Sequence, residues 1–234
     1  MATLENLIKW DQELLLSINS YHVPWLDRFM WLFSETIMWL PVLFALIIVL
    51  YKNKKAQTFF ILLTFGLLIL FTDQMSSSVI KPLVERFRPT HDPEIGNLIN
   101  VVNNYRGGNY GFVSSHAANV FAFAGLSLLF FRNWAYTLVI LLWAATVSYS
   151  RIYLGVHFPL DVFCGAALGL LSSVVFFYIY KVILQRSSAI RLTSDRRPKQ
   201  VTSSNYIKND LYYLILVLLV VVVTMLLASI KLAW

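Results

Sequence analysis

Three short clusters of residues in this sequence could carry catalytic chemistry. They read Lys81-Pro-Leu-Val-Glu-Arg-Phe-Arg88-Pro89, Ser114-Ser115-His116 and Ser150-Arg151-Ile-Tyr-Leu-Gly-Val-His157-Phe-Pro-Leu-Asp161. The lysine and the arginines supply positive charge and N–H donors for phosphate oxygens. The two histidines can divide the work of nucleophile and general acid. Asp161 follows His157 by four residues, so a helix that begins there lets its carboxylate reach the imidazole and fix the tautomer.

Taken singly, each cluster has a plainer explanation. A lysine or arginine at the end of an apolar span is more often an interfacial anchor, and a histidine at a helix start is more often a satisfied polar residue. All three clusters, however, fall at the ends of predicted membrane spans and on the same side. Because charge beside lipid is costly, its repeated placement at one level favours a site. The combination predicts phosphoryl transfer.

At these residues the chain resembles the type 2 phosphatidic acid phosphatase family, which shares its site with vanadium haloperoxidases and bacterial acid phosphatases. The family pattern is K-x6-RP, then PSGH, then SR-x5-H-x3-D. The first and third elements are matched in full, and the second is matched at Ser114 and His116. Val113 replaces the proline and Ser115 replaces the glycine. If position 115 requires a positive φ, serine costs about 1 kcal/mol there. The resemblance covers residues 27–180.

The resemblance implies a role for each matched residue. His157 attacks phosphorus and becomes a phosphohistidine, Asp161 orients it, and His116 protonates the leaving oxygen and then activates water. The phosphate oxygens are held by a set of cations and donors: Lys81, Arg88, Arg151, Ser114 and the backbone N–H of Ser115. Fixed cations of this kind stabilise a loose phosphoryl transition state without a metal, so no metal or other cofactor is expected.

The leading hypothesis is therefore a metal-independent lipid phosphatase with a phosphohistidine intermediate. Its candidate substrates are undecaprenyl diphosphate, phosphatidylglycerol phosphate or phosphatidate, and the phosphate of lipid A. Two alternatives remain open, a vanadate-dependent haloperoxidase-like enzyme and a non-catalytic lipid-binding membrane protein. Arg86 and Arg106 are further cations near the site, and they are either contacts for a second phosphate or interfacial anchors.

The composition is that of a membrane protein. Apolar residues make up 58% of the 234 residues and charged residues only 13%, far from the mix of a soluble domain. The formal charge of +7 is then typical of cytoplasmic loops that face anionic headgroups, rather than of nucleic-acid binding. The single cysteine, Cys164, excludes a disulfide framework within the chain.

Hydropathy predicts an all-α bundle with six transmembrane helices and an N-terminal amphipathic helix lying in the interface. The predicted spans are residues 29–51, 58–80, 117–131, 134–150, 158–180 and 211–230, and the interfacial helix covers residues 4–18. Between the second and third spans, residues 82–115 form a long polar loop that we expect to cover the site. The motif 165–169, Gly-Ala-Ala-Leu-Gly, offers small residues for close helix packing.

We expect one membrane-embedded domain over residues 1–234. It comprises the interfacial helix and turn (1–28), a catalytic core (29–180), a basic cytoplasmic loop (181–210) and a final span (211–234). The basic loops at Lys52–Lys55, Arg132 and Lys181–Lys208 share one side, which the positive-inside rule assigns to the cytoplasm. The active site then faces the periplasm or exterior, from what is predicted to be a bacterial inner membrane.

Overall fold

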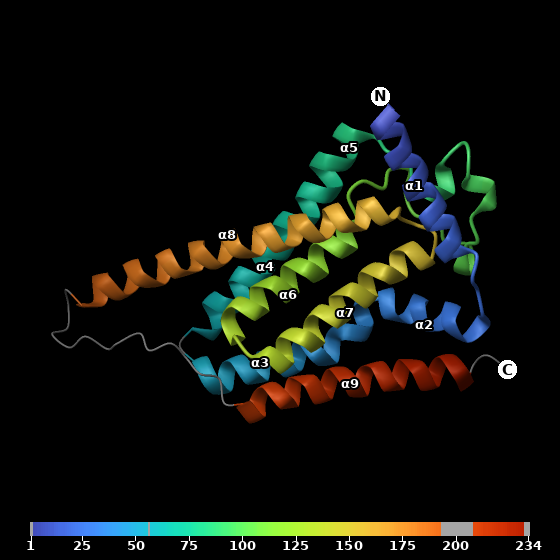
Figure 1. Cartoon of the computed structure of the whole chain (residues 1–234). Helices are drawn as coiled ribbons and strands as arrows, with labels where there is room; N and C mark the ends of the chain where they lie inside the picture. Colours follow the sequence, from blue (N-terminus) through green and yellow to red (C-terminus); the bar gives the residue numbers. More distant parts are fainter. Residues whose placement is uncertain (1, 56, 193–207, 232–234) are drawn as a thin grey trace.

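The structure is a computed structural model that describes the backbone of residues 2–55, 57–192 and 208–231, and every regular element in this part of the chain is helical (Figure 1). Long helices lie alongside one another as a bundle: α2 (Pro24–Ser34), α3 (Leu40–Lys54), α4 (Thr58–Gln74), α6 (Ser115–Phe131), α7 (Trp134–Tyr153), α8 (Pro159–Leu192) and α9 (Lys208–Lys231). The predicted all-α class is therefore confirmed for the described residues.

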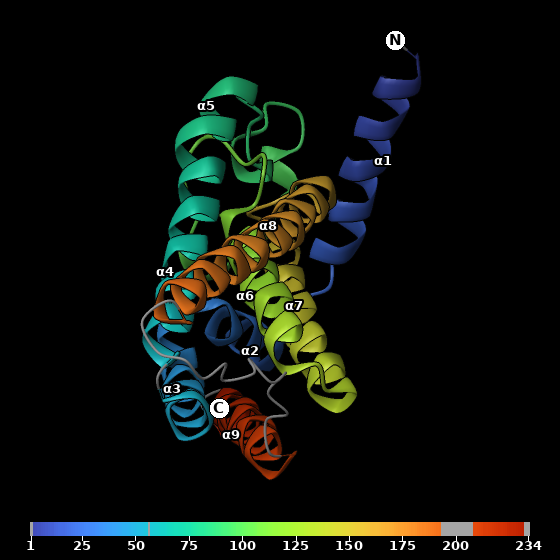
Figure 2. The ribbon, with the colours of Figure 1, turned by 90° about the vertical axis from the view of Figure 1, so that its left-hand side faces the viewer.

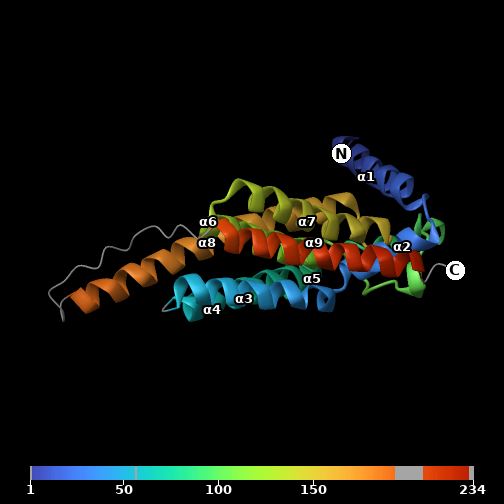
Figure 3. The same cartoon turned by 90° about the horizontal axis from the view of Figure 1, so that it is seen from below.

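The polar segments gather at one end of the bundle. There α1 (Ala2–Asn19) contacts α7 and α8 and is hydrogen-bonded through Asn19 to Asn100 in the loop that joins the short helix α5 (Lys81–Val84) to α6. Figure 2 shows α1 and α5 at this same end. The last turns of α8 extend past the other helices at the opposite end (Figure 1). Seen from below, α9 runs along the bundle, where it packs on α2, α3 and α7 (Figure 3).

Among the described residues, five helices are long and apolar enough to cross a membrane: Thr36–Lys54, Thr58–Val84, Trp134–Tyr153, Pro159–Arg186 and Asn209–Lys231. The third predicted span is α6, which has only 17 residues and falls below that length. It packs against α4, α7 and α8, so it is the most enclosed of the apolar helices. Four of its alanines, at positions 117, 118, 122 and 124, are fully buried.

The close packing predicted for residues 165–169 is confirmed at the contact of α6 with α8. A Cβ on Gly165 would lie 2.5 Å from the carbonyl oxygen of Ser114, and a Cβ on Gly169 would lie 2.2 Å from that of Ala118. Neither position has room for a methyl group, because real Cβ contacts to oxygen are about 3.3 Å or longer. These two glycines therefore set the distance between α8 and the start of α6.

The first predicted span, 29–51, is wrong as a single helix. Helix α2 ends at Ser34, Glu35 is extended with φ −77° and ψ 120°, and a 3-10 turn over Thr36–Trp39 leads into α3. The indole N–H of Trp39 donates to the carbonyl of Phe33 at 3.1 Å, which satisfies a carbonyl freed by the break. Pro41 lacks the N–H needed to continue a helix. The interruption divides the predicted span into α2 and α3.

Two further differences from the prediction concern the ends of the second and fifth spans. The fifth helix does not end at 180 but continues to Leu192, because residues 181–192 contain no glycine or proline and several strong helix formers. The rest of the predicted basic loop, residues 193–207, lies outside the described residues. The second span ends in a π-helical segment, Met75–Ile80, before α5. Such segments occur frequently at functional sites, and this one leads directly to Lys81.

Candidate active site

A cavity of about 560 Å³ opens at the end of the bundle where the three sequence clusters meet. Five predicted site residues line it: Arg88, Ser115, His116, Arg151 and His157. They come from the loop before α6, from the first turn of α6, from the end of α7 and from the turn between α7 and α8. Segments far apart in the sequence are thus brought together as predicted.

His157 and Asp161 are held by the turn that begins α8. The N–H groups of Val156 and His157 donate to the carbonyl of Arg151 at 3.1 and 3.2 Å, and Gly155 provides the positive φ of 70° that the turn requires. Oδ2 of Asp161 lies 3.5 Å from Nδ1 of His157 and accepts the N–H of Phe158 at 3.0 Å. The predicted four-residue pairing is therefore present, with the two groups slightly beyond hydrogen-bond distance.

The electrostatic surroundings keep the His157 imidazole neutral. Burial lowers the pKa of His157 well below its usual value, and the cations Arg88, Arg151 and Lys81 lower that pKa further. Only 1% of the His157 surface is exposed. A neutral imidazole has a free lone pair, so this residue stands in the form that a nucleophile or base requires.

Both arginines of the cavity present donors without protein partners. Arg151 donates through Nη1 to the hydroxyl of Ser34 at 2.7 Å, and its Nε has no partner. Arg88 donates through Nε to the carbonyl of Tyr110 at 3.1 Å, and its Nη1 has no partner. Buried polar groups are almost always hydrogen-bonded. Two guanidinium groups that line one cavity and each keep an unpaired donor are suited to the oxygens of an anion.

Lys81 reaches the site through Ser115, the residue that departs from the family pattern. Its Nζ donates to the Ser115 hydroxyl, which also accepts from the hydroxyl of Ser76 at 2.9 Å. Ser115 is the first residue of α6 and is not among the described non-glycine residues with positive φ. The strain considered for serine at this position therefore does not arise. Its hydroxyl instead anchors the lysine.

The structure places Ser114, a predicted phosphate donor, at the N-cap of α6. Its hydroxyl caps α6 by accepting the N–H of Ala117 at 3.4 Å, and its own N–H donates to the carbonyl of Asp161 at 2.9 Å. The side chain is fully buried and does not line the cavity. Ser114 thus ties the start of α6 to the first turn of α8, which holds His116 and Asp161 in fixed relation.

The suggestion that Arg86 contacts a second phosphate is wrong, because two buried carboxylates occupy its guanidinium. Arg86 donates to Asp161 at 2.8 Å and to Asp11 at 2.6 Å. Arg106 extends to the carbonyl of Thr90 at 3.4 Å. Neither arginine lines the cavity.

Sequence reasoning missed several residues that contact the site. The sequence analysis predicted that Ser34 lies within a continuous span. In the structure it is the last residue of α2, where it accepts a hydrogen bond from Arg151. Asn119 lines the cavity and donates to Asp73 at 3.3 Å. A signal for it was available, because Asn119 is a polar residue one helical turn after His116 in an apolar segment. Asp73 also lines the cavity.

Among the described residues, no group of three or more His, Cys, Asp or Glu side chains is placed to hold a metal ion. Metal independence stays a prediction.

Comparisons with known proteins identify the family of this chain. The model of the PAP2 superfamily matches residues 59–184. A lipid A 4'-phosphatase of Porphyromonas gingivalis is 37% identical over 207 residues, which are 88% of this chain and 86% of that protein. A lipid A 4'-phosphatase of Bacteroides thetaiotaomicron is 40% identical over 181 residues, 75% of this chain and 79% of that protein. The crystal structure of Aquifex aeolicus LpxE shares 28% identity with a TM-score of 0.54, covering 71% of this chain and 93% of that one.

The apolar helices, the cation-lined cavity and these relatives define an integral membrane lipid phosphatase. The chain belongs to the PAP2 superfamily, as the family match and the extended identity show. The resemblance noted from the three sequence clusters is thereby confirmed. The relatives from Porphyromonas gingivalis and Bacteroides thetaiotaomicron are named phosphatases, which favours hydrolysis over the haloperoxidase and non-catalytic alternatives.

Proposed function

We propose that this protein hydrolyses a phosphate from lipid A through a phosphohistidine intermediate. The observation that carries the proposal is a single cavity in which two buried arginines with open N–H donors and two histidines stand beside an extensive apolar wall. A phosphate attached to a large lipid fits such a cavity. The choice of lipid A among lipid phosphates is supported by the two relatives of that name, which match most of this chain.

His157 is the nucleophile. Asp161 faces its Nδ1 at 3.5 Å, which leaves Nε2 to form a bond with phosphorus as the bond to the leaving oxygen breaks. The imidazole acquires positive charge in this step, and the buried carboxylate stabilises that charge. A second step, attack of water on the phosphohistidine, releases phosphate and restores the neutral histidine.

His116 is the general acid and then the general base. It lines the same cavity as His157 and begins α6 next to the lysine anchor at Ser115. In the first step it protonates the leaving oxygen, and in the second it takes a proton from the attacking water. Arg88, Arg151 and Lys81 hold the non-bridging oxygens, with the N–H of Ser115 as a further donor. Ser114 supports this set by fixing the helix start.

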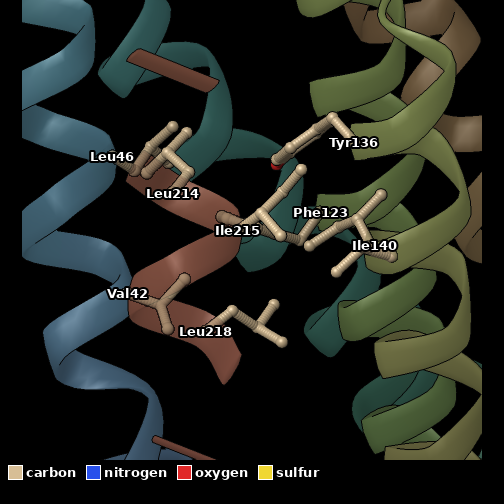
Figure 4. A pocket seen from close by; sticks show the side chains of 9 residues that line it. Val42, Leu46, Phe123, Tyr136, Ile140, Leu214, Ile215 and Leu218 are labelled. Atoms are coloured by element: carbon tan, nitrogen blue, oxygen red, sulfur yellow. The ribbon is translucent and has the colours of Figure 1, made fainter. Parts of the chain in front are cut away.

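The lipid part of the substrate leaves the cavity sideways. Inward, the cavity borders a small gap beyond Val42 and Phe123, which the side chains of Tyr136, Ile140 and Leu214 help to enclose (Figure 4). That gap holds only about 10 Å³, room for about one water molecule. On the other side, Leu40 and Leu43 of α3 line the cavity and are each 42% exposed. Acyl chains can therefore pass across α3 into the surrounding lipid.

We further infer six membrane spans, with the short helix α6 as the third, and an α1 that lies in the interface. Several large apolar side chains of α1 are exposed at its outer part: Leu4, Leu7, Ile8 and Trp10. A helix with such a surface is suited to the headgroup boundary. The whole chain then forms one domain in a bacterial inner membrane, and the basic loops place the catalytic end toward the periplasm or exterior.

Purified protein in detergent tests the function. Phosphate release should be faster from lipid A than from undecaprenyl diphosphate, phosphatidylglycerol phosphate or phosphatidate. Rapid quenching with labelled substrate should trap phosphate on His157, and His157→Ala should abolish turnover, whereas His116→Ala should slow it. Label on another residue refutes the nucleophile, and a strong preference for one of the other lipids refutes the substrate.

Cysteine labelling in intact spheroplasts tests the orientation in a Cys164→Ser background. Asn97 is exposed in the loop before α6, and Lys55 is exposed at the opposite end of the bundle. Asn97→Cys should react with a membrane-impermeant maleimide, and Lys55→Cys should react only after lysis. The reverse pattern places catalysis in the cytoplasm.

A further inference from the structure

Arg86 lies between two buried carboxylates that come from distant parts of the chain. Its Nη1 donates to Oδ1 of Asp161 at 2.8 Å and its Nη2 donates to Oδ2 of Asp11 at 2.6 Å. Both carboxylates belong to fully buried residues, whereas the Arg86 side chain is 22% exposed. The guanidinium also stacks over the ring of Phe158, 4.1 Å from its centre. Hydrogen bonds and stacking together fix the plane of this guanidinium.

The burial of Asp11 is unusual for a charged residue of an interfacial helix. Charged residues of such a helix normally face water, as Lys9 and Glu13 do at 75% and 66% side-chain exposure. Asp11 is instead fully buried against the start of α8, where its Oδ1 accepts the N–H of Leu160 at 2.9 Å. Both of its oxygens are therefore used next to Asp161, and neither is used by α1 itself. Burial raises the pKa of Asp11, and the hydrogen bond from Arg86 opposes that shift.

These contacts determine how the Asp161 carboxylate is presented. Arg86 occupies Oδ1, and the N–H of Phe158 holds Oδ2 at 3.0 Å. Oδ2 is the atom that faces His157. With both oxygens fixed, the carboxylate cannot rotate away from the imidazole. The positive charge of Arg86 also lies directly against the Asp161 carboxylate, the group proposed to stabilise a charged phosphohistidine.

We infer that Asp11 and Arg86 are positioning residues, which hold Asp161 against His157 and make helix α1 part of the catalytic apparatus. The inference rests on the role of Asp161 proposed above. Neither residue touches the cavity, so both act through Asp161 and not on the substrate. A complete site thus requires α1 to be docked on α8, although α1 contributes no residue that meets the phosphate.

Kinetics of point variants of the full-length protein test this inference, with lipid A and with phosphatidate as substrates. Arg86→Gln should lower kcat about 10–100-fold, the usual effect of losing a group that orients a catalytic residue, while KM changes less than about twofold. Arg86→Lys, which keeps the charge, should recover part of the loss. Asp11→Asn should lower kcat in the same sense but less, because Arg86 still holds Asp161. Glu13→Gln, on the exposed side of the same helix, should behave like the wild type.

A double-mutant cycle separates positioning from general stability. If Asp11 acts through Arg86, Asp11→Asn should have no further effect on kcat in the Arg86→Gln background. Additive effects, unchanged kcat in Arg86→Gln, or a rise in KM alone would overturn the inference. If Arg86→Gln does not fold, the same decision is made with Arg86→Lys and Asp11→Asn by the rate at which phosphate is trapped on His157. Failure of wild-type protein to act on lipid A would refute the substrate alone, because phosphatidate turnover still reports the positioning.

Discussion

Gly165→Ala should impair catalysis by separating two helices that carry different halves of the site. The new methyl carbon would lie 2.5 Å from the carbonyl oxygen of Ser114 and 3.3 Å from Cβ of Ala117. Since a normal carbon–oxygen contact is about 3.3–3.6 Å, α6 and α8 must move apart by about 1 Å. Overpacking of this kind costs about 1–3 kcal/mol of stability.

The displacement falls where it matters most for the chemistry. Ser114 donates its N–H to the carbonyl of Asp161 at 2.9 Å, so a shift of Ser114 strains the link between His116 on α6 and Asp161 on α8, and with it the position of His157 in the turn before α8. A misplacement of about 1 Å can reduce a rate about 100-fold. We expect kcat for lipid A hydrolysis to fall about 10–100-fold in protein that still elutes as a folded species.

Phosphate release and thermal unfolding in detergent measure the two effects. Gly66→Ala is the matched control, because a Cβ on this glycine of α4 meets nothing within 4 Å and alanine favours the helix by about 0.5–1 kcal/mol. It should leave kcat unchanged and raise the melting temperature slightly. Full activity in Gly165→Ala would refute the claim that the distance between α6 and α8 sets the geometry of the site.

Four further predictions concern the charges of the site. Ser34→Ala removes the acceptor of Arg151 Nη1, and because hydrogen bonds to charged groups contribute about 1.5–3 kcal/mol, kcat/KM should fall about 10–100-fold; an unchanged value would show that Ser34 does not orient the arginine. Asp73 places a carboxylate on the cavity wall, next to Asn119, where its negative charge would repel the second phosphate of a diphosphate. Asp73→Asn should therefore raise kcat/KM for undecaprenyl diphosphate relative to lipid A, and equal changes for both substrates would contradict this repulsion. The pKa of His157 is lowered in the folded protein, so the unfolded state binds a proton at this residue first as the pH falls. The free energy of unfolding should therefore fall as the pH drops below about 6.5, by up to about 1.4 kcal/mol per pH unit. Denaturation curves of His157→Asn should lack this part of the pH dependence. Activity should survive a chelator and be inhibited by vanadate, whereas loss in chelator with recovery on adding magnesium would refute a metal-free site.

The amino-acid sequence by itself predicted the family and five of the residues that line the cavity. Spacing within the three clusters predicted that the cations and histidines lie at or near helix ends: Lys81, Arg88, His116, Arg151 and His157. His157 and Asp161 are four residues apart, which brings their side chains close together where a helix starts, independently of tertiary contacts. Hydropathy was equally informative about the all-α class, because a long continuous apolar segment in lipid satisfies its backbone hydrogen bonds within itself as a helix.

Only the tertiary structure showed which residues support the cavity residues from outside the cavity. The break after Ser34 depends on a hydrogen bond from Trp39 and on Pro41, and it cannot be read from hydropathy because both sides of it are apolar. Arg86 was indistinguishable from a phosphate ligand until its two carboxylates were seen. One of these, Asp11, comes from a helix that local sequence describes only as amphipathic. Periodicity reports which face of a helix is apolar, but the partner of a buried charge depends on contacts between segments far apart in the chain. The two partners of Arg86, Asp11 and Asp161, each lie 75 residues from it in the sequence. Local sequence patterns contain no information about contacts at that separation.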